Sequence, residues 1–152
     1  MFKETRLLLK NSGLHNFWDI HKYMEFGGYL TFKNVLTQTS DEILTIINKS
    51  GLKGRGGAGF PTGFKTKATS DSSAKCLKYV VCNADEGEPG TFKDRILMEQ
   101  NPHQIIEGIL IAAKAIGAIW GYIYIRGEYY ESIEKMKLAI QQAEQNNLIG
   151  DN

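Results

Sequence analysis

The chain has few cysteines and almost no net charge, and each shortage excludes a class of protein. Cys76 and Cys82 are its only cysteines, too few for a disulfide scaffold or for a complete zinc or iron–sulfur site. A net charge of +1 gives no overall field toward nucleic acid or a membrane surface. The most apolar stretch, residues 105–120, contains Glu107 and Lys114 and is too short to cross a bilayer. We therefore expect no nucleic-acid partner, no bound metal in this chain and no direct membrane insertion.

The remaining composition is that of a globular protein of 152 residues, with 42% hydrophobic and 23% charged residues. That length gives room for one domain with a real core and hardly for two. The two cysteines flank an apolar run, and we expect both thiols to be reduced and buried. We expect no signal peptide, because Lys3, Glu4 and Arg6 interrupt the start of the sequence. We expect the cytoplasm or the mitochondrial matrix as its compartment.

Hydrophobic patterning predicts a helical beginning followed by alternating strands and helices. Residues 1–38 indicate short, interrupted helices, and a helix follows at 40–49, where Thr39 and Glu42 form a capping box. The predicted buried stripe of that helix consists of Ile43, Leu44, Ile46 and Ile47. The later strands and helices are predicted, in alternation, at 77–82, 101–117, 122–125 and 130–146.

The strand–helix–strand–helix order requires a parallel pair of strands with a right-handed crossover. The predicted fold class is therefore α/β. It comprises a helical N-terminal region, residues 1–50, and a parallel-sheet domain, residues 51–152.

The most informative segment is the glycine-rich stretch at residues 54–65, which we call the glycine loop. Glycine lets a backbone adopt positive φ and bring its N–H groups close to a ligand, while Arg55 and Lys65 add fixed positive charge. Two phenylalanines argue against a flexible linker, and residues 60–63 fit a β-turn. We expect an ordered loop that cradles a phosphorylated cofactor.

Two common nucleotide-binding motifs are excluded by their context. Gly54, Gly56 and Gly59 have the spacing of the dinucleotide fingerprint, but that motif needs a strand before it and a helix after it. Here a capped helix precedes the loop and a proline follows the third glycine. A phosphate-loop lysine follows its glycine directly, whereas Phe64 intervenes in this chain.

An acidic segment, residues 83–91, follows the first predicted strand, and we call it the acidic loop. Ligands of open parallel sheets bind beyond the carboxyl ends of the strands, where the acidic loop and residues 126–128 both lie. We expect these two strand ends to lie beside each other. We also expect the acidic loop to bind a ligand there, and a solvated acidic turn without a ligand is the alternative. Side chains suited to bind hydroxyl and ring N–H groups are those of Asn83, Asp85, Glu86 and Glu88.

Residues 50–63, 83–95 and 122–128 together closely resemble one family, the FMN- and NADH-binding subunit of respiratory complex I. The same module occurs in NAD-linked hydrogenases and formate dehydrogenases, and the resemblance extends from about residue 10 to the end. It implies hydride transfer from NADH to FMN, followed by single-electron steps through iron–sulfur clusters to quinone. It also implies partner subunits, among them a thioredoxin-like 2Fe–2S subunit, and a location peripheral to the membrane.

The resemblance further implies roles for individual residues. Phe60 would stack on the NADH adenine and Glu88 would approach the nicotinamide, so that Glu86 and Glu88 are the candidate catalytic residues. The flavin's ribityl chain and ring edge would be held by Asn83, Asp85 and Glu86. The glycine loop would line the FMN and nicotinamide site with Gly54, Arg55, Gly56, Gly57, Ala58, Gly59, Phe60 and Lys65.

The sequence departs from this family in two ways. The family usually continues after the matching lysine with Trp-Ser-Phe, where this chain has Thr66, Lys67 and Ala68. A second adenine-stacking aromatic is therefore missing, and we expect weaker NADH binding. Family members also continue well beyond residue 152, with a further nucleotide-binding segment, a small β domain and a four-cysteine 4Fe–4S domain. The resemblance thus implies that residues 51–152 are the N-terminal half of an incomplete, Rossmann-like FMN- and NADH-binding domain. We expect this portion to have little or no activity alone.

A non-catalytic alternative stays open, in which the chain is a split or decayed interaction module completed by another chain. The open edge of an incomplete sheet, with Trp18, Phe26 and Tyr29, would then serve docking. An unrelated phosphate-binding domain would instead bind ATP tightly. The choice among complex I, a hydrogenase and a formate dehydrogenase is also left open.

Overall fold

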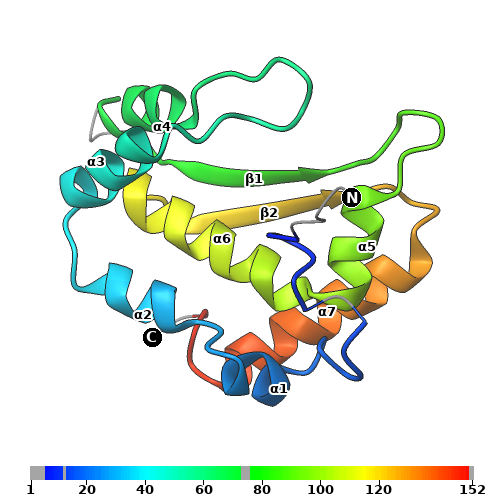
Figure 1. The fold of residues 1–152 in the computed structure, drawn as a ribbon. Coiled ribbons are helices and arrows are strands. Elements are labelled where there is room, and N and C mark those ends of the chain that lie inside the picture. The colour runs from blue at the N-terminus through cyan, green and yellow to red at the C-terminus, as the bar shows by residue number, and fades with distance from the viewer. Residues whose placement is uncertain (1–5, 12, 73–75, 151–152) are drawn as a thin grey trace, which may run out of the picture. The chain divides into compact units, whose positions relative to one another are not determined.

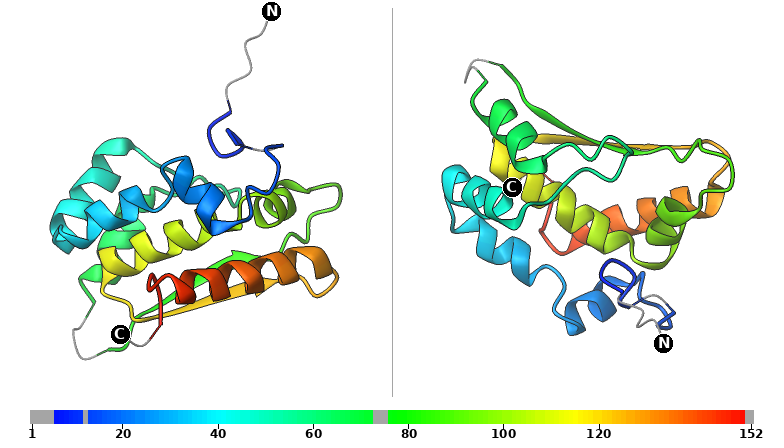
Figure 2. Two further views of the ribbon diagram at one scale, coloured as in Figure 1. Left: turned by 90° about the horizontal axis from the view of Figure 1, so that it is seen from below. Right: turned by 45° about the horizontal axis from the view of Figure 1, so that its top comes forward.

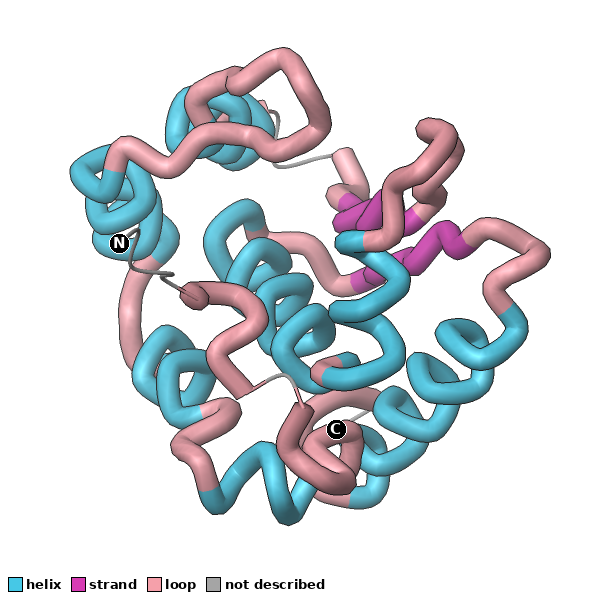
Figure 3. The backbone as a smooth tube through the Cα atoms, turned by 45° about the vertical axis from the view of Figure 1, so that its right-hand side comes forward, coloured by secondary structure: helices cyan, strands magenta, loops and turns pink. Residues whose placement is uncertain are grey.

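The computed structural model describes residues 6–11, 13–72 and 76–150. Its strands, β1 (Tyr79–Ala84) and β2 (Trp120–Ile125), pair in parallel, as the arrows in Figure 1 show. Figure 3 shows the same two strands side by side in magenta. The helices are α1 (Ile20–Glu25), α2 (Leu30–Leu36), α3 (Ser40–Ser50), α4 (Thr62–Ser70), α5 (Lys93–Gln100), α6 (Pro102–Ile116) and α7 (Tyr130–Gln145). The prediction of an α/β fold with a parallel pair of strands is confirmed.

The chain divides into two compact units. The first unit combines the residues up to Gly28 with Asn83–Glu107 and the residues from Ile123 onward. The second unit combines Tyr29–Cys82 with Gly108–Tyr122. The predicted boundary at residue 50 rests on the sequence alone and stays a prediction.

A polar cluster connects three helices within the first unit. The Tyr23 hydroxyl of α1 donates a hydrogen bond to Glu107 of α6, and its ring stacks on that of His103, with centroids 5.7 Å apart. His103 Nε2 lies 2.9 Å from Gln142 Oε1 of α7. Burial lowers the pKa of His103 and outweighs its contact with Gln142. His103 is therefore a fully buried packing residue.

Helix α3 organises the second unit, and its beginning follows the predicted capping box. The Thr39 hydroxyl accepts the backbone N–H of Glu42, whose carboxylate accepts the Thr39 N–H at 2.8 Å. Ile43 of α3 packs with Val35 and Ala115 in a small core, which Ile47 and Ile111 extend. The prediction for Ile46 was wrong, because its side chain points outward and is 56% exposed.

Helix α4 is the largest departure from the predicted elements. It begins directly after Pro61, which is its N-cap, where the sequence predicted a β-turn at residues 60–63 and no helix. It lies beside α3 (Figures 1 and 2). One reason for rejecting the dinucleotide fingerprint therefore fails, since a helix does follow the glycines. The other reason holds, because helix α3 and not a strand precedes them.

The cysteine prediction and the first strand also need correction. Cys76 is exposed and Cys82 is half-buried, and neither forms a disulfide. Strand β1 begins at Tyr79, two residues later than predicted, and exposed residues alternate along it. Residues of β1 that were expected to be buried are exposed because only one further strand pairs with β1 in the described sheet and one face of the pair is open.

Among the docking aromatics considered from the sequence, Tyr29 was wrongly assigned to the surface. Its side chain is fully buried, and its backbone adopts a left-handed conformation with φ of 61° at the start of α2. The ring of Trp18 is covered by Lys135, whose Nζ lies 4.0 Å from the ring centroid. Phe26 is half-exposed. Among the described residues, no helix is long and apolar enough to cross a membrane.

Candidate functional site

Two backbone hydrogen bonds close the base of the glycine loop. The Gly54 N–H donates to the Phe60 carbonyl at 2.8 Å, and the Thr62 N–H donates to the Leu52 carbonyl at 2.9 Å. An isolated antiparallel bridge between Lys53 and Pro61 lies between these bonds. The loop thus leaves α3 and returns to α4 through a fixed neck, and the expectation of an ordered loop agrees with this geometry.

The interior of the glycine loop has an open backbone. Gly57 and Gly59 have φ of 104° and 61°, conformations that disfavour other residues. A Cβ placed at Gly56, Gly57 or Gly59 would meet no other atom within 4 Å. Arg55 and Ala58 are exposed beside these glycines. The loop therefore presents accessible main chain and one guanidinium group to any ligand that approaches it.

An aromatic pair stands where the glycine loop enters α4. The rings of Phe60 and Phe64 meet edge to face, with centroids 5.8 Å apart, and half or more of each side chain is exposed. Lys65 and Ala68 lie on the same helix and are also exposed. Because residues four apart share a helix face, Phe64 and Ala68 are neighbours on α4. Sequence reasoning noted Phe64 only as a linker-breaking residue and missed this pairing.

The acidic loop turns sharply at its start. The side-chain oxygen of Asn83 accepts the backbone N–H of Asp85 at 3.2 Å, and Asn83, Asp85 and Glu88 are exposed. The Thr91 hydroxyl donates to the Glu88 carbonyl at 2.6 Å, which stabilises the second half of the loop. The side-chain amide of Asn83 and the carboxylates of Asp85 and Glu88 thus face solvent.

Glu86 differs from its neighbours because its carboxylate is buried. Its two oxygens accept the backbone N–H groups of Asp94, at 3.1 Å, and Arg95, at 3.3 Å, in the first turn of α5. The ammonium group of Lys93 lies 3.7 Å away. Burial raises the pKa of the Glu86 carboxyl, but these N–H groups and Lys93 together hold it below its ordinary value. Glu86 is an ionised cap for a helix that begins seven residues after it.

The two strand ends lie beside each other, as the parallel topology predicted. Arg126, directly after β2, donates from Nη1 to the Glu86 carbonyl at 3.3 Å and from Nε to Glu128 at 3.2 Å. The guanidinium group therefore links residues 126–128 to the acidic loop. It also lowers the pKa of Glu128, after the larger effect of a backbone hydrogen bond at that residue.

The predicted residues thus fall into two groups, one in each compact unit. The structure brings Glu86 to Arg126 in the first unit, and Arg55, Phe60 and Lys65 to one loop and helix start in the second. Within the described ranges, no group of three or more histidine, cysteine, aspartate or glutamate side chains is arranged to hold a metal ion.

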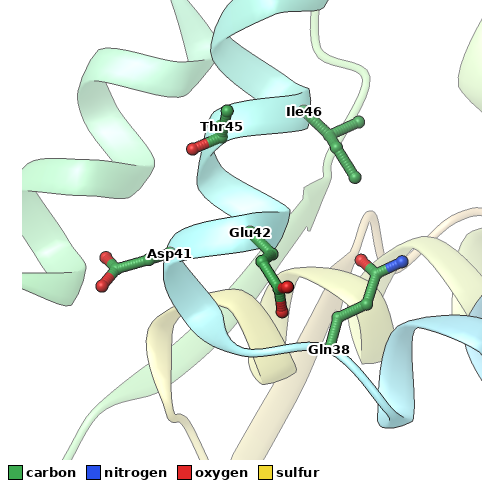
Figure 4. Close-up of a pocket in the computed structure, with 5 residues that line it drawn as sticks. All are labelled: Gln38, Asp41, Glu42, Thr45 and Ile46. Carbon is green, nitrogen blue, oxygen red and sulfur yellow. The ribbon is translucent and has the colours of Figure 1, made fainter.

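A shallow hollow in the second unit contains none of the predicted site residues. It has a volume of about 450 Å³ and is lined by Gln38, Asp41, Glu42, Thr45 and Ile46 (Figure 4). The carboxylate of Glu42 already serves the capping box, and the backbone N–H of Thr39 lowers its pKa. The hollow is therefore a surface feature along the exposed side of α3, and we assign no binding function to it.

Polar loops at the carboxyl ends of parallel strands are typical of the class of α/β proteins that bind nucleotide-like cofactors. The family described as the Nuo51 FMN-binding domain matches residues 47–150. The chain belongs to this family.

Similar proteins come from two kinds of oxidoreductase. The NADH-quinone oxidoreductase F 2 subunit of Rhizobium meliloti (strain 1021) is 48% identical over 95% of this chain and 34% of its own length. The NADH-quinone oxidoreductase F subunit of Aquifex aeolicus (strain VF5) is 45% identical over 100% of this chain and 36% of its own length. A crystal structure of an NAD⁺-reducing [NiFe]-hydrogenase in the H₂-reduced state matches 74% of this chain and 19% of its own, at 40% identity and a TM-score of 0.66. The chain spans about a third of the length of the curated relatives it matches.

Proposed function

We propose that this chain is the N-terminal portion of a flavoprotein subunit that oxidises NADH by hydride transfer to FMN. Electrons would then pass through iron–sulfur clusters of the whole assembly to quinone. The observation that carries the proposal is membership of the Nuo51 FMN-binding family together with an open glycine loop. The partners would be other subunits, including a thioredoxin-like 2Fe–2S subunit, in an assembly peripheral to the membrane.

The glycine loop fits FMN on physical grounds. The space that a Cβ would fill at Gly56, Gly57 and Gly59 is open, so backbone N–H groups can approach a phosphate. Arg55 adds a guanidinium group suited to phosphate, and Lys65 adds an ammonium group. Bound FMN supplies the capacity to accept two electrons and release them singly. This chain's own contribution is to bind and orient the cofactor.

The acidic loop has two proposed tasks. Asn83 and Asp85 would bind hydroxyl groups of the ribityl chain, and Glu88 would approach the nicotinamide, because all three side chains are exposed. Glu86 acts differently in this proposal, since both of its oxygens accept N–H groups of α5. It would fix the loop in place as a positioning residue, with its backbone carbonyl held by Arg126.

A hydrogenase subunit is the second candidate function. It is favoured by the likeness to the NAD⁺-reducing [NiFe]-hydrogenase, at 40% sequence identity. The chemistry proposed for this chain is the same in both assemblies, and only the final electron partner differs. A non-catalytic module, the third candidate, would retain the fold without binding FMN.

Titration with FMN tests the proposal at Arg55. Flavin fluorescence should change on binding to the purified chain. Arg55→Ala should weaken affinity by roughly ten- to a hundredfold, because a charge-assisted contact contributes roughly 1.5–3 kcal/mol. Lys49→Ala is the matched control, since it removes one exposed cation from the end of α3. Unchanged fluorescence with the parent chain, and no co-elution of FMN, would favour the non-catalytic module.

Stacking on the glycine loop gives a separate prediction for NADH. Phe60→Ala should weaken NADH binding and Ala68→Phe should strengthen it, each by about 1–3 kcal/mol, because base–aromatic stacking has that magnitude. Ala68 is exposed, so a phenylalanine fits there without repacking. Calorimetric titration of both variants in the FMN-loaded protein provides the measurement. Phe26→Ala, a half-exposed ring at the end of α1, should leave NADH affinity unchanged.

A further inference from the structure

A closed series of polar contacts connects α1 to α6 and α7 within the first unit. Tyr23 of α1 contacts both Glu107 and His103 of α6. His103 in turn contacts Gln142 of α7. The side-chain amide of Gln142 donates to Asp19 Oδ2 at 3.5 Å, and Asp19 is the N-cap of α1. We call these five residues the α1 latch, and Figure 1 shows α1 beside α7.

The centre of the α1 latch is buried, which disfavours a positive charge there. His103 is fully buried, and Tyr23 and Glu107 are 7% and 9% exposed. An imidazolium group in this environment loses hydration, so the neutral imidazole is favoured. Burial accordingly lowers the pKa of His103, although its polar contacts act in the opposite direction.

The groups that face His103 come from α1, α6 and α7. The carboxylate of Asp19 attracts a positive charge on the imidazole, and the ring of Tyr23 stacks on it. Glu107 lies one turn further along α6 on the same helix face and accepts the Tyr23 hydroxyl. Gln142, the neighbour on α7, is neutral. The attraction of Asp19 thus offsets part of the cost of burial but not all of it.

We propose that the α1 latch is an acid-sensitive device, which holds α1 on α6 and α7 at neutral pH and loosens in mild acid when His103 takes up a proton. Opening of the latch lets the imidazolium group regain its hydration, so protonation favours the open arrangement. Opening also exposes Phe17 and Ile20, which are 2% and 1% exposed in the closed arrangement. The inference goes beyond the proposed function, because it requires neither FMN nor NADH.

The working pH range follows from the two arrangements of the imidazole. In the open arrangement His103 has the ordinary pKa of an exposed histidine, about 6.5. In the closed arrangement its pKa is lower. The hold on α1 is therefore fully present above about pH 6.5 and is lost progressively as the pH falls toward the closed-state pKa.

Hydrogen exchange of the α1 amides measures this hold directly. The Tyr23 N–H donates to the Asp19 carbonyl and the Gly28 N–H donates to the Tyr23 carbonyl, each at 2.9 Å. Protection factors report the opening equilibrium once they are corrected for the intrinsic dependence of exchange on pH. For these amides they should fall severalfold between about pH 7.5 and about pH 5.5, on either side of the ordinary histidine pKa. The amides of α3 in the second unit should keep constant protection factors over the same range.

Three variants test whether His103 is the responsible group. His103→Gln is uncharged at every pH and should abolish the acid response of α1. His21→Gln is the matched control, because it removes an exposed imidazole from α1 itself and should leave the response unchanged. Asp19→Asn keeps an N-cap residue for α1 but removes the charge that favours the imidazolium group. It should therefore enlarge the acid response severalfold.

Several outcomes would overturn the proposal. One is a protection factor for α1 that does not change with pH in the parent chain. Another is an undiminished acid response in His103→Gln, which would assign the response to a carboxylate. A parallel loss of protection in α3 would show that the whole chain opens and that α1 is not released separately. If His103→Gln does not fold, Asp19→Asn decides the question, and a response no larger than that of the parent chain refutes the role of His103.

Discussion

Replacing Gly63 by alanine is expected to destabilise the second unit by about 2 kcal/mol. A Cβ at this position would lie 2.0 Å from Oδ1 and 2.9 Å from Cα of Asn48 on α3. The side-chain oxygen can move away, but the Cα is part of the backbone and can only yield if α3 and α4 separate. Overpacking of this kind costs about 1–3 kcal/mol and occasionally more, and alanine's higher helix propensity offsets up to about 1 kcal/mol of it.

Thermal unfolding measures the effect of Gly63→Ala. A loss of about 2 kcal/mol corresponds to a fall in Tm of roughly 4–8 °C for a chain of this size. Gly56→Ala is the matched control, because its Cβ would meet nothing within 4 Å. Adding Asn48→Ala to Gly63→Ala should restore part of the loss, since it removes the nearest side-chain atoms and leaves only the clash with the main chain of α3. Equal Tm values for the Gly63 and Gly56 variants would mean that α3 and α4 do not approach as closely as described.

Removing the carboxylate of Glu86 is expected to have the second large effect, about 3 kcal/mol at neutral pH. Hydrogen bonds to a charged group contribute about 1.5–3 kcal/mol, and unsatisfied buried donors add a further penalty. In Glu86→Ala, the first turn of α5 loses the acceptor for the N–H groups of Asp94 and Arg95. Urea unfolding of Glu86→Ala measures the loss. Glu88→Ala, two residues away and exposed, should change stability by less than about 0.5 kcal/mol.

The contribution of Glu86 should depend on pH in a defined direction. The pKa of this carboxyl lies lower in the folded chain than in an unfolded one, where it is about 4.3. The stabilisation is therefore fully present above about pH 4.3 and is lost as the pH falls through the folded-state pKa. The stability difference between the parent chain and Glu86→Ala should be constant near neutrality and shrink in acid. A difference that stayed constant into strong acid would show that the carboxylate is not the stabilising form.

The elements with local signals were predictable from the sequence. Helix α3 begins at the capping box of Thr39 and Glu42, whose partners lie within the helix itself. Helix α6 begins at Pro102 directly after Asn101 and ends before Gly117, which has φ of 73°. In each case the residues that start or stop the helix are adjacent to it, so the local sequence contains all of the information.

The elements that the sequence missed depend on partners elsewhere. Helix α5 has no side-chain cap at Phe92, and its cap comes from Glu86, outside any local motif. Helix α4 has little apolar patterning, and its one buried residue is Gly63, which is packed against α3. No local pattern distinguishes these segments from polar loops, because tertiary contacts supply what their own sequences lack.

The candidate site was predictable as a set of residues but not as a set of roles. The glycine loop and the acidic loop were recognisable from composition and from their places next to a helix and a strand. The sequence did not reveal that the Glu86 carboxylate is turned inward while Asp85 and Glu88 face solvent. That division depends on α5, which was not predicted. The proposed contacts of each residue with FMN or NADH stay predictions.

The neck of the glycine loop has a consequence for how this protein can vary. Its base is closed by main-chain bonds between Gly54 and Phe60 and between Leu52 and Thr62, and these bonds do not depend on the residues in between. Arg55, Gly56 and Ala58 can therefore be exchanged, and the loop can be extended by a few residues, at little thermodynamic cost to the helices on either side. The positive φ of Gly57 and Gly59 still disfavours other residues at those two positions. Ligand preference and folding stability are thus separable here. Apart from the two glycines with positive φ, the sequence and length of this loop can therefore change without compensating changes in the helices on either side of it.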